Sequence, residues 1–119
     1  MRNFRDLEVW RDSVQLVKKV YLLLSNYPTS EKYGLVSQIS RSGLSISSNI
    51  AEGCSRDSQK EFSRYLQISL GSSFELETQL EISKELGFLS YEEHGEIIKE
   101  LHIIQKRLQS LKKYAESKI

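Results

Sequence analysis

The sequence predicts an all-α protein, in which 119 residues fold as a single domain into an antiparallel up-and-down four-helix bundle. Apolar residues recur every three or four positions in four long segments, which is the period of a helix, and no segment alternates with period two. Short connections with stop signals at Pro28, Gly53 and Gly87 separate these segments, so successive helices run in opposite directions. The expected helices cover residues of about 6–26, 30–52, 58–86 and 90–116.

The first expected helix carries two apolar lines. One line, spaced 3, 4, 3, 4 and 3, comprises Leu7, Trp10, Val14, Val17, Tyr21 and Leu24. The other line, about 120° away on a helical wheel, comprises Val9, Leu16, Val20, Leu23 and Tyr27. Because a helix of a small bundle buries one stripe, we expect the first line to face the core and the second to contact another subunit. The alternative is a bundle that buries one broad face of this helix.

The second expected helix has a stripe of short polar side chains beside its apolar stripe. Thr29 and Ser30 can cap its start, and the residues expected in the core are Leu35, Ile39, Gly43, Ile46 and Ile50. The polar stripe consists of Gln38, Arg41, Ser45, Asn49 and Glu52. It contains no lysine, which a solvated face usually carries. Two interpretations stay open: the stripe holds subunits together, or it is solvated or packed against another helix of the same chain.

Ser58 and Ser90 each stand three residues before a glutamate, which predicts a capping box at the start of the third and fourth helices. The third helix is expected to bury Phe62, Leu66, Ser69, Ser73, Leu76 and Leu80, and Gly71–Ser73 to permit close helix packing. The fourth is expected to bury Ile97, Leu101, Ile104, Leu108, Leu111 and Ala115.

Residues that could carry catalysis or hold a metal are few and far apart. His94 and His102 are the only histidines, and Cys54 is the only cysteine, so no metal set of ordinary spacing is formed. A glycine-rich phosphate loop and a nucleophile elbow are also missing from the sequence. We expect no enzyme activity, no metal and no cofactor. The lone cysteine and a charged amino terminus favour a cytoplasmic protein without a membrane partner.

Charge is distributed unevenly between the two ends of the expected bundle. Residues 1–17, 41–64 and 101–119 share one end, with 12 Lys/Arg and 7 Asp/Glu, and the other end has 5 and 9. The net charges of the two ends are therefore +5 and −4, which add up to +1 for the whole chain. Helix dipoles explain part of this split, but not Lys60 and Arg64 near the start of a helix. We expect the positive end to bind phosphates of RNA or DNA without reading base sequence. The candidate contacts are Arg56, Lys60, Arg64, Lys106, Arg107, Lys112 and Lys113.

Three runs carry a resemblance to a known family: FRDLEVWRDSVQLVKKVY (4–21), EKYGLVSQISRSGLSISSNIAEG (31–53) and KEFSRYLQISLGSSFELETQLEISKELGFL (60–89). They resemble the 23S rRNA intervening-sequence proteins, also called four helix bundle proteins or S23 ribosomal proteins. The resemblance implies a homopentamer of four-helix bundles. It also implies a relation to the accessory protein of diversity-generating retroelements, which binds nucleic acid and a reverse transcriptase. Two functions follow as hypotheses: a nucleic-acid-binding protein, or a scaffold ring that docks a protein partner such as a reverse transcriptase without binding nucleic acid itself.

Overall fold

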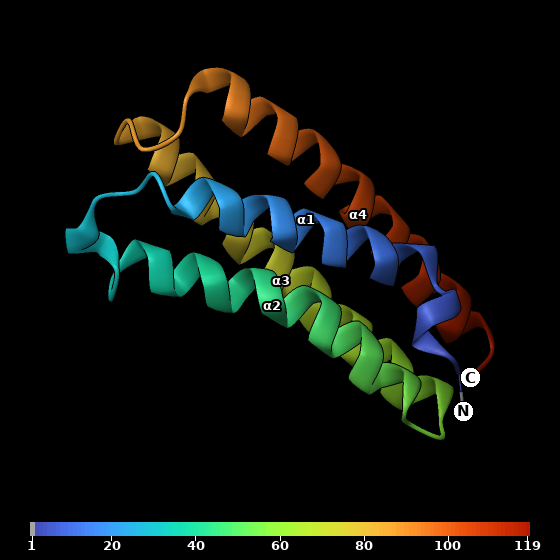
Figure 1. The fold of residues 1–119 in the computed structure, drawn as a ribbon. Helices are drawn as coiled ribbons and strands as arrows, with labels where there is room; N and C mark the ends of the chain where they lie inside the picture. The colour runs from blue at the N-terminus through green and yellow to red at the C-terminus, as the bar shows by residue number, and fades with distance from the viewer. Residues whose placement is uncertain (1) are drawn as a thin grey trace.

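The computed structural model describes residues 2–119 and contains four α-helices, of which each runs antiparallel to the next along the chain (Figure 1). They are α1 (Glu8–Leu24), α2 (Leu35–Cys54), α3 (Gln59–Glu85) and α4 (Tyr91–Ser117), with single 3-10 turns at η1 (Phe4–Asp6) and η2 (Thr29–Glu31). Residues 2–119 contain no β-strand. The predicted all-α class and four-helix bundle are therefore confirmed.

The ends of α3 and α4 follow local sequence signals. Gly87 has a positive φ of 80°, and its amide and that of Phe88 donate to the carbonyls of Lys84 and Ser83, which closes the last turn of α3. The capping box at Ser90 is complete, because its hydroxyl accepts from the Glu93 amide while the Glu93 carboxylate accepts from the Ser90 amide.

Two other predicted helix starts are corrected. The Ser58 hydroxyl accepts from the Glu61 amide, but the Glu61 carboxylate pairs with Arg64, so only half of that capping box exists. Helix α2 begins at Leu35 instead of residue 30, because the residues after Pro28 form the 3-10 turn η2. The Glu31 carboxylate then accepts the Leu35 amide at 3.2 Å, replacing the expected hydroxyl cap.

The core face of α1 is the line that the sequence assigned to a subunit contact. Val9, Leu16 and Val20 are only 4%, 2% and 1% exposed and belong to the core of the chain itself. Their assignment to an oligomer interface is therefore wrong. The physical reason is Ser13, which is 1% exposed and donates its hydroxyl proton to the Trp10 carbonyl at 2.7 Å. A serine that is satisfied in this way completes the buried stripe without breaking it.

The line that was expected in the core lies on the flank of α1. Leu7 and Trp10 are only partly buried against the core, and Tyr21 is 45% exposed. The exception is Leu24, which is buried. Leu23, from the other line, is also partly buried against the core.

Small residues bring the helices close together at particular points. A Cβ at Gly43 would lie 2.9 Å from a Val17 methyl on α1, and a Cβ at Gly53 would lie 2.8 Å from the Tyr65 Cβ on α3. The Ser69 hydroxyl, fully buried, donates to the Ile46 carbonyl at 2.8 Å. Gly71 has no such role, because a Cβ there would meet no atom within 4 Å. The close-packing prediction for Gly71 is thus corrected.

Candidate nucleic-acid interface

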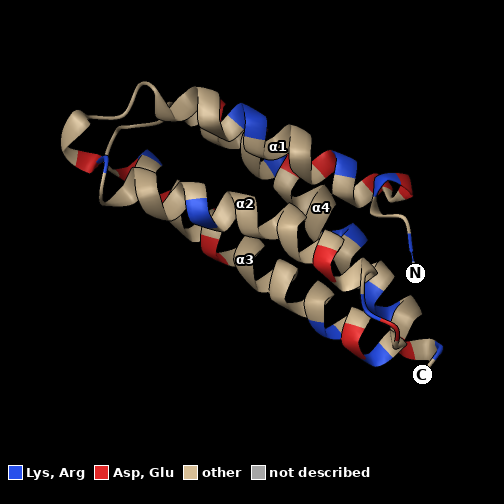
Figure 2. Cartoon of the chain, turned by 60° about the horizontal axis from the view of Figure 1, so that its bottom comes forward, with Lys and Arg blue, Asp and Glu red and all other residues tan. Residues whose placement is uncertain are grey.

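The two chain termini and the α2–α3 turn lie together at one end of the bundle (Figure 1). This end, formed by residues 2–17, 41–64 and 101–119, is called the basic end below. The Arg2 amide donates to the Cys54 carbonyl at 3.3 Å, which ties the amino terminus to the last turn of α2. Lysines and arginines from segments far apart in sequence gather here (Figure 2). The antiparallel topology therefore brings together the three segments whose summed charge is positive. Residues 2–17 contain three basic and three acidic residues, so the positive excess comes from 41–64 and 101–119.

Arg56, Lys60 and Arg64 surround the α2–α3 turn and differ in their partners. The guanidinium carbons of Arg56 and Arg64 lie 4.9 and 4.7 Å from the centre of the buried Tyr65 ring. Arg56 also donates to the Tyr65 hydroxyl at 2.7 Å and pairs with Glu52 at 3.2 Å. Arg64 pairs with Glu61 at 2.8 Å, and this hydrogen bond lowers the pKa of the Glu61 carboxyl below its ordinary value. Lys60 is exposed and forms no ion pair with residues 2–119.

The four basic candidates on α4 point in different directions. Arg107 faces α1, where it pairs with Glu8 at 3.0 Å and also with Asp12. Lys112 pairs with Glu116 at 3.2 Å. Lys106 and Lys113 are exposed, and neither forms an ion pair with any part of the chain that the structure describes. Seven residues separate them, which is about 10 Å along one face of a helix.

These pairings rank the candidates by how readily each can meet a phosphate. Lys60, Lys106 and Lys113 have no carboxylate partner within residues 2–119 that a phosphate would have to displace. Exposed pairs such as those of Arg64 and Lys112 are each worth only about 0–1 kcal/mol, so a phosphate can displace the carboxylate. Arg107 bridges two carboxylates of α1 and is the least available.

Arg2 belongs to the same cluster but was absent from the predicted contacts. Its guanidinium lies 4.0 Å from the centre of the Phe62 ring and donates to the Arg56 carbonyl at 3.3 Å and to the Gln59 side chain at 2.5 Å. Its position among the first residues of the positive end was the available sequence signal. Its side-chain contacts, which lie 54 to 60 residues away, were not readable from sequence.

The polar stripe of α2 divides between packing inside the bundle and exposure. The Ser45 hydroxyl lies 2.7 Å from the Ser72 hydroxyl of α3, and Asn49 donates to the Ser45 carbonyl and hydroxyl, each at 2.8 Å. These contacts support packing within the bundle for this part of the stripe. Gln38, Arg41 and Glu52 are exposed, and Glu52 is paired with Arg56.

Residues that could support metal or thiol chemistry are not brought together at this end. Among residues 2–119, no three His, Cys, Asp or Glu side chains form a group that could hold a metal ion. Cys54 is buried, and desolvation raises the pKa of its thiol although Arg2 nearby acts in the opposite direction. No helix in the described part of the chain has the length and apolar character needed to span a membrane.

Comparison with known proteins agrees with this architecture. The 23S rRNA-intervening sequence protein family matches residues 5–110 of the chain. The chain belongs to this family. A solved structure from Bacteroides thetaiotaomicron VPI-5482, described as a protein with unknown function from the S23 ribosomal protein family, superposes with a TM-score of 0.79. It is 30% identical in sequence and covers 88% of this chain and 98% of its own.

No curated protein matches the chain. The family resemblance seen in the sequence is confirmed. Neither the family nor the solved relative is described as an enzyme, and the relative is described as having unknown function. The function must therefore be argued from the residues of this chain.

Proposed function

We propose that this chain is a non-enzymatic, self-associating cytoplasmic protein that binds RNA or DNA through its basic end. The observation that carries the proposal is the meeting of cations from the amino terminus, the α2–α3 turn and the last turns of α4 at one end (Figure 2). Cations that face solvent bind the phosphate backbone without regard to base sequence, and they release counterions as they do so. The family name refers to 23S rRNA, which makes RNA the first ligand to test.

In the proposed mechanism, Lys60, Lys106 and Lys113 provide the first contacts because they have no carboxylate partner in the described chain. Arg56 and Arg64 follow by exchanging carboxylates for phosphates, while stacking on Tyr65 keeps their guanidinium groups in place. Arg107 keeps its ion pairs with α1 and does not contact a phosphate itself. It contributes only to the electrostatic potential at the basic end.

Self-association would multiply these contacts, because every copy adds one basic end to the assembly. A homopentamer is what the family resemblance implies, and it remains part of the proposal. With Val9, Leu16 and Val20 buried, an interface must use other residues. Large apolar side chains that are exposed and available for it include Tyr21, Leu22, Leu44 and Ile68. Light scattering coupled to size-exclusion chromatography at micromolar concentration measures the assembly directly, and a monomer there would defeat this part of the proposal.

A salt titration with charge-reversed variants tests nucleic-acid binding. Lys106→Glu combined with Lys113→Glu should weaken binding of a fluorescent RNA hairpin or a DNA duplex by at least about tenfold and lower the slope of log K against log salt. The matched control is Lys18→Glu with Lys99→Glu, two exposed lysines outside the basic end. No binding at low salt, or equal weakening by both pairs, would defeat the proposal.

The second candidate function is a scaffold that docks a protein, with any nucleic acid held by that partner. Two exposed apolar side chains of α3, Phe74 and Ile82, favour it. A reverse transcriptase, which the family resemblance implies, is the partner to test first. Co-purification with and without nuclease separates the two functions, because a partner retained after nuclease treatment is bound by protein contacts alone.

A further inference from the structure

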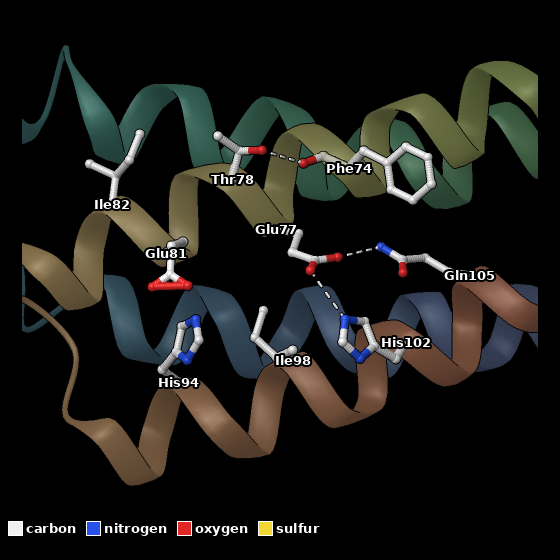
Figure 3. Close-up of a pocket in the computed structure, with 9 residues that line it drawn as sticks. All are labelled: Phe74, Glu77, Thr78, Glu81, Ile82, His94, Ile98, His102 and Gln105. Carbon is white, nitrogen blue, oxygen red and sulfur yellow. Dashed lines mark hydrogen bonds and ion pairs between the residues drawn. The ribbon is translucent and has the colours of Figure 1, made fainter.

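An open groove of about 820 Å³ runs between α3 and α4 (Figure 3). The side chains that line it come from both helices. Figure 3 shows Glu77 and Glu81 of α3 pointing toward the α4 side chains, whereas Thr78 and Ile82 point the other way in that view. They are Phe74, Glu77, Thr78, Glu81, Ile82, His94, Ile98, His102 and Gln105. The groove contains both histidines of the chain, neither of which is among the proposed phosphate contacts.

The charged side chains that line the groove are of one sign. Glu77 and Glu81 stand one turn apart on α3, and the lining includes neither lysine nor arginine. Glu77 accepts from Gln105 Nε2 at 2.8 Å and from His102 Nε2 at 3.1 Å. Desolvation alone would raise the pKa of Glu77, but these two hydrogen bonds outweigh it and lower the pKa. Glu77 is thus held as an oriented carboxylate.

Glu81 adds a carboxylate that a ligand can engage, and His94 lies beside it. Glu81 pairs with Lys84 at 2.7 Å, and its side chain is 50% exposed, so the pair can be exchanged for an incoming cation. His94 Nε2 is buried and has no hydrogen-bond partner within residues 2–119. Its ring lies beside Glu81 in the groove (Figure 3).

Apolar side chains form the rest of the surface. Phe74 is 48% exposed and Ile82 45% exposed, and Ile98 of α4 is partly buried and packs against the core. Phe74 and Ile82 are eight positions apart, which is about 12 Å along α3 and a little more than two turns of a helix. An apolar strip of this length beside fixed carboxylates has the chemistry of a helix-binding groove.

We propose that this groove docks an amphipathic helix of a partner protein that carries lysine or arginine among its apolar residues. The apolar residues would lie on Phe74, Ile82 and Ile98, and the cations would reach Glu77 and Glu81. The sign of the charge selects the occupant, because the same two carboxylates repel the phosphates of a nucleic acid. The proposal is independent of nucleic-acid binding, which uses cations elsewhere on the chain.

The test uses a fluorescent 18-residue helical peptide of leucine, alanine and lysine, with a control peptide in which glutamate replaces every lysine. Binding is followed by anisotropy at low salt and located by backbone and histidine NMR shifts in the full-length protein. Glu77→Gln with Glu81→Gln should weaken binding of the basic peptide by about tenfold. The matched control is Glu75→Gln with Glu85→Gln, exposed glutamates of α3 outside the lining. Circular dichroism and a urea titration confirm that each variant is folded.

The expected result is binding of the basic peptide with shifts at His94 and His102, lost with the groove pair and kept with the control pair. Absence of basic-peptide binding, equal binding of the acidic peptide, or equal weakening by both pairs overturns the proposal. A change in oligomer size on Glu77→Gln with Glu81→Gln also overturns it, because the occupant would then be a second copy of this chain. RNA affinity is measured for the same variants and should not fall, so failure of this proposal and failure of nucleic-acid binding remain distinguishable.

Discussion

Helices α2 and α3 meet through small side chains, whereas α1 and α4 are joined at their edges by long charged ones. Between α2 and α3, the fully buried Ser69 binds a backbone carbonyl and the hydroxyls of Ser45 and Ser72 lie 2.7 Å apart. Between α1 and α4, Arg107 reaches Glu8 and Asp12, and Lys19 reaches Glu100. These charged pairs are well exposed, at 54% and 38% for the two side chains of the Lys19 pair.

The difference shows that one bundle uses two kinds of helix contact. Small residues let two backbones approach, so the α2–α3 contact depends on shape and tolerates little change in volume. Exposed ion pairs contribute little each and weaken with salt, so the α1–α4 contact is easily altered. Substitutions at the first contact should therefore cost much more stability than substitutions at the second.

The largest effect is expected from Ile46→Ala in the core beside the α2–α3 contact. Ile46 is 1% exposed, so truncation leaves a cavity and should lower the free energy of unfolding by about 2–5 kcal/mol. The control is Ile103→Ala on α4, where the side chain is 44% exposed and the loss should be below about 1 kcal/mol. Urea unfolding followed by circular dichroism measures both. Similar losses would contradict the contrast between the two contacts.

A pair of glycines tests close approach directly. Gly53→Ala should lower stability by about 1–3 kcal/mol, since its new Cβ would lie 2.8 Å from the Tyr65 Cβ. Gly71→Ala places a methyl in open space and should raise stability by up to about 1 kcal/mol through helix propensity alone. Thermal unfolding of the two variants gives the comparison. Destabilisation by Gly71→Ala would reveal a neighbour against the outer face of α3.

The contact between α3 and α4 should be sensitive to acid. Because the folded pKa of Glu77 lies below the ordinary value of 4.5, its stabilising effect is present above that pH and is lost as the pH falls through the lower folded value. Glu77→Gln should flatten this part of the stability curve. Urea titrations between pH 7 and pH 3 compare the variant with the wild type. A curve for Glu77→Gln that is as steep as that of the wild type would show that Glu77 has no share in the acid response.

The smallest effect is expected from Lys19→Ala at the α1–α4 edge. The exposed pair with Glu100 should contribute about 0–1 kcal/mol at low salt and less as salt is added. Stability is measured at two salt concentrations, with Lys18→Ala, an exposed neighbour without an ion pair in the described chain, as the control. A decrease in the free energy of unfolding above about 2 kcal/mol that does not change with salt would mean that the α1–α4 edge matters as much for stability as the α2–α3 contact.

The sequence predicted helix ends correctly where the residues that form the capping hydrogen bonds lie within a few positions of one another. Gly87 and Ser90 bind groups within one turn of themselves, so their residue types predicted the structure correctly. The start of α2 was mispredicted because two local solutions competed after Pro28. The Glu31 carboxylate and a 3-10 turn supplied the cap that the hydroxyls of Thr29 and Ser30 were expected to supply.

The sequence did not predict which side of α1 packs against the core. Two apolar lines compete on this helix, and periodicity gives both equal weight. The line that faces the core contains the buried Ser13, whose hydroxyl is satisfied by a hydrogen bond within the helix. A search for apolar residues in the sequence cannot detect this, because it counts serine as polar. Only packing against the other helices distinguishes the two lines.

The sequence by itself determined four helices, their order, and the meeting at one end of the three segments whose summed charge is positive, because helix period and short connections are local properties. The tertiary structure alone decided which of those cations remain available, since Arg107 is held by Asp12 from 95 residues away. It also decided that Glu77, His102 and Gln105 meet in one groove. Side-chain pairing across helices depends on the relative rotation and offset of packed elements, and core packing sets these only in the assembled bundle.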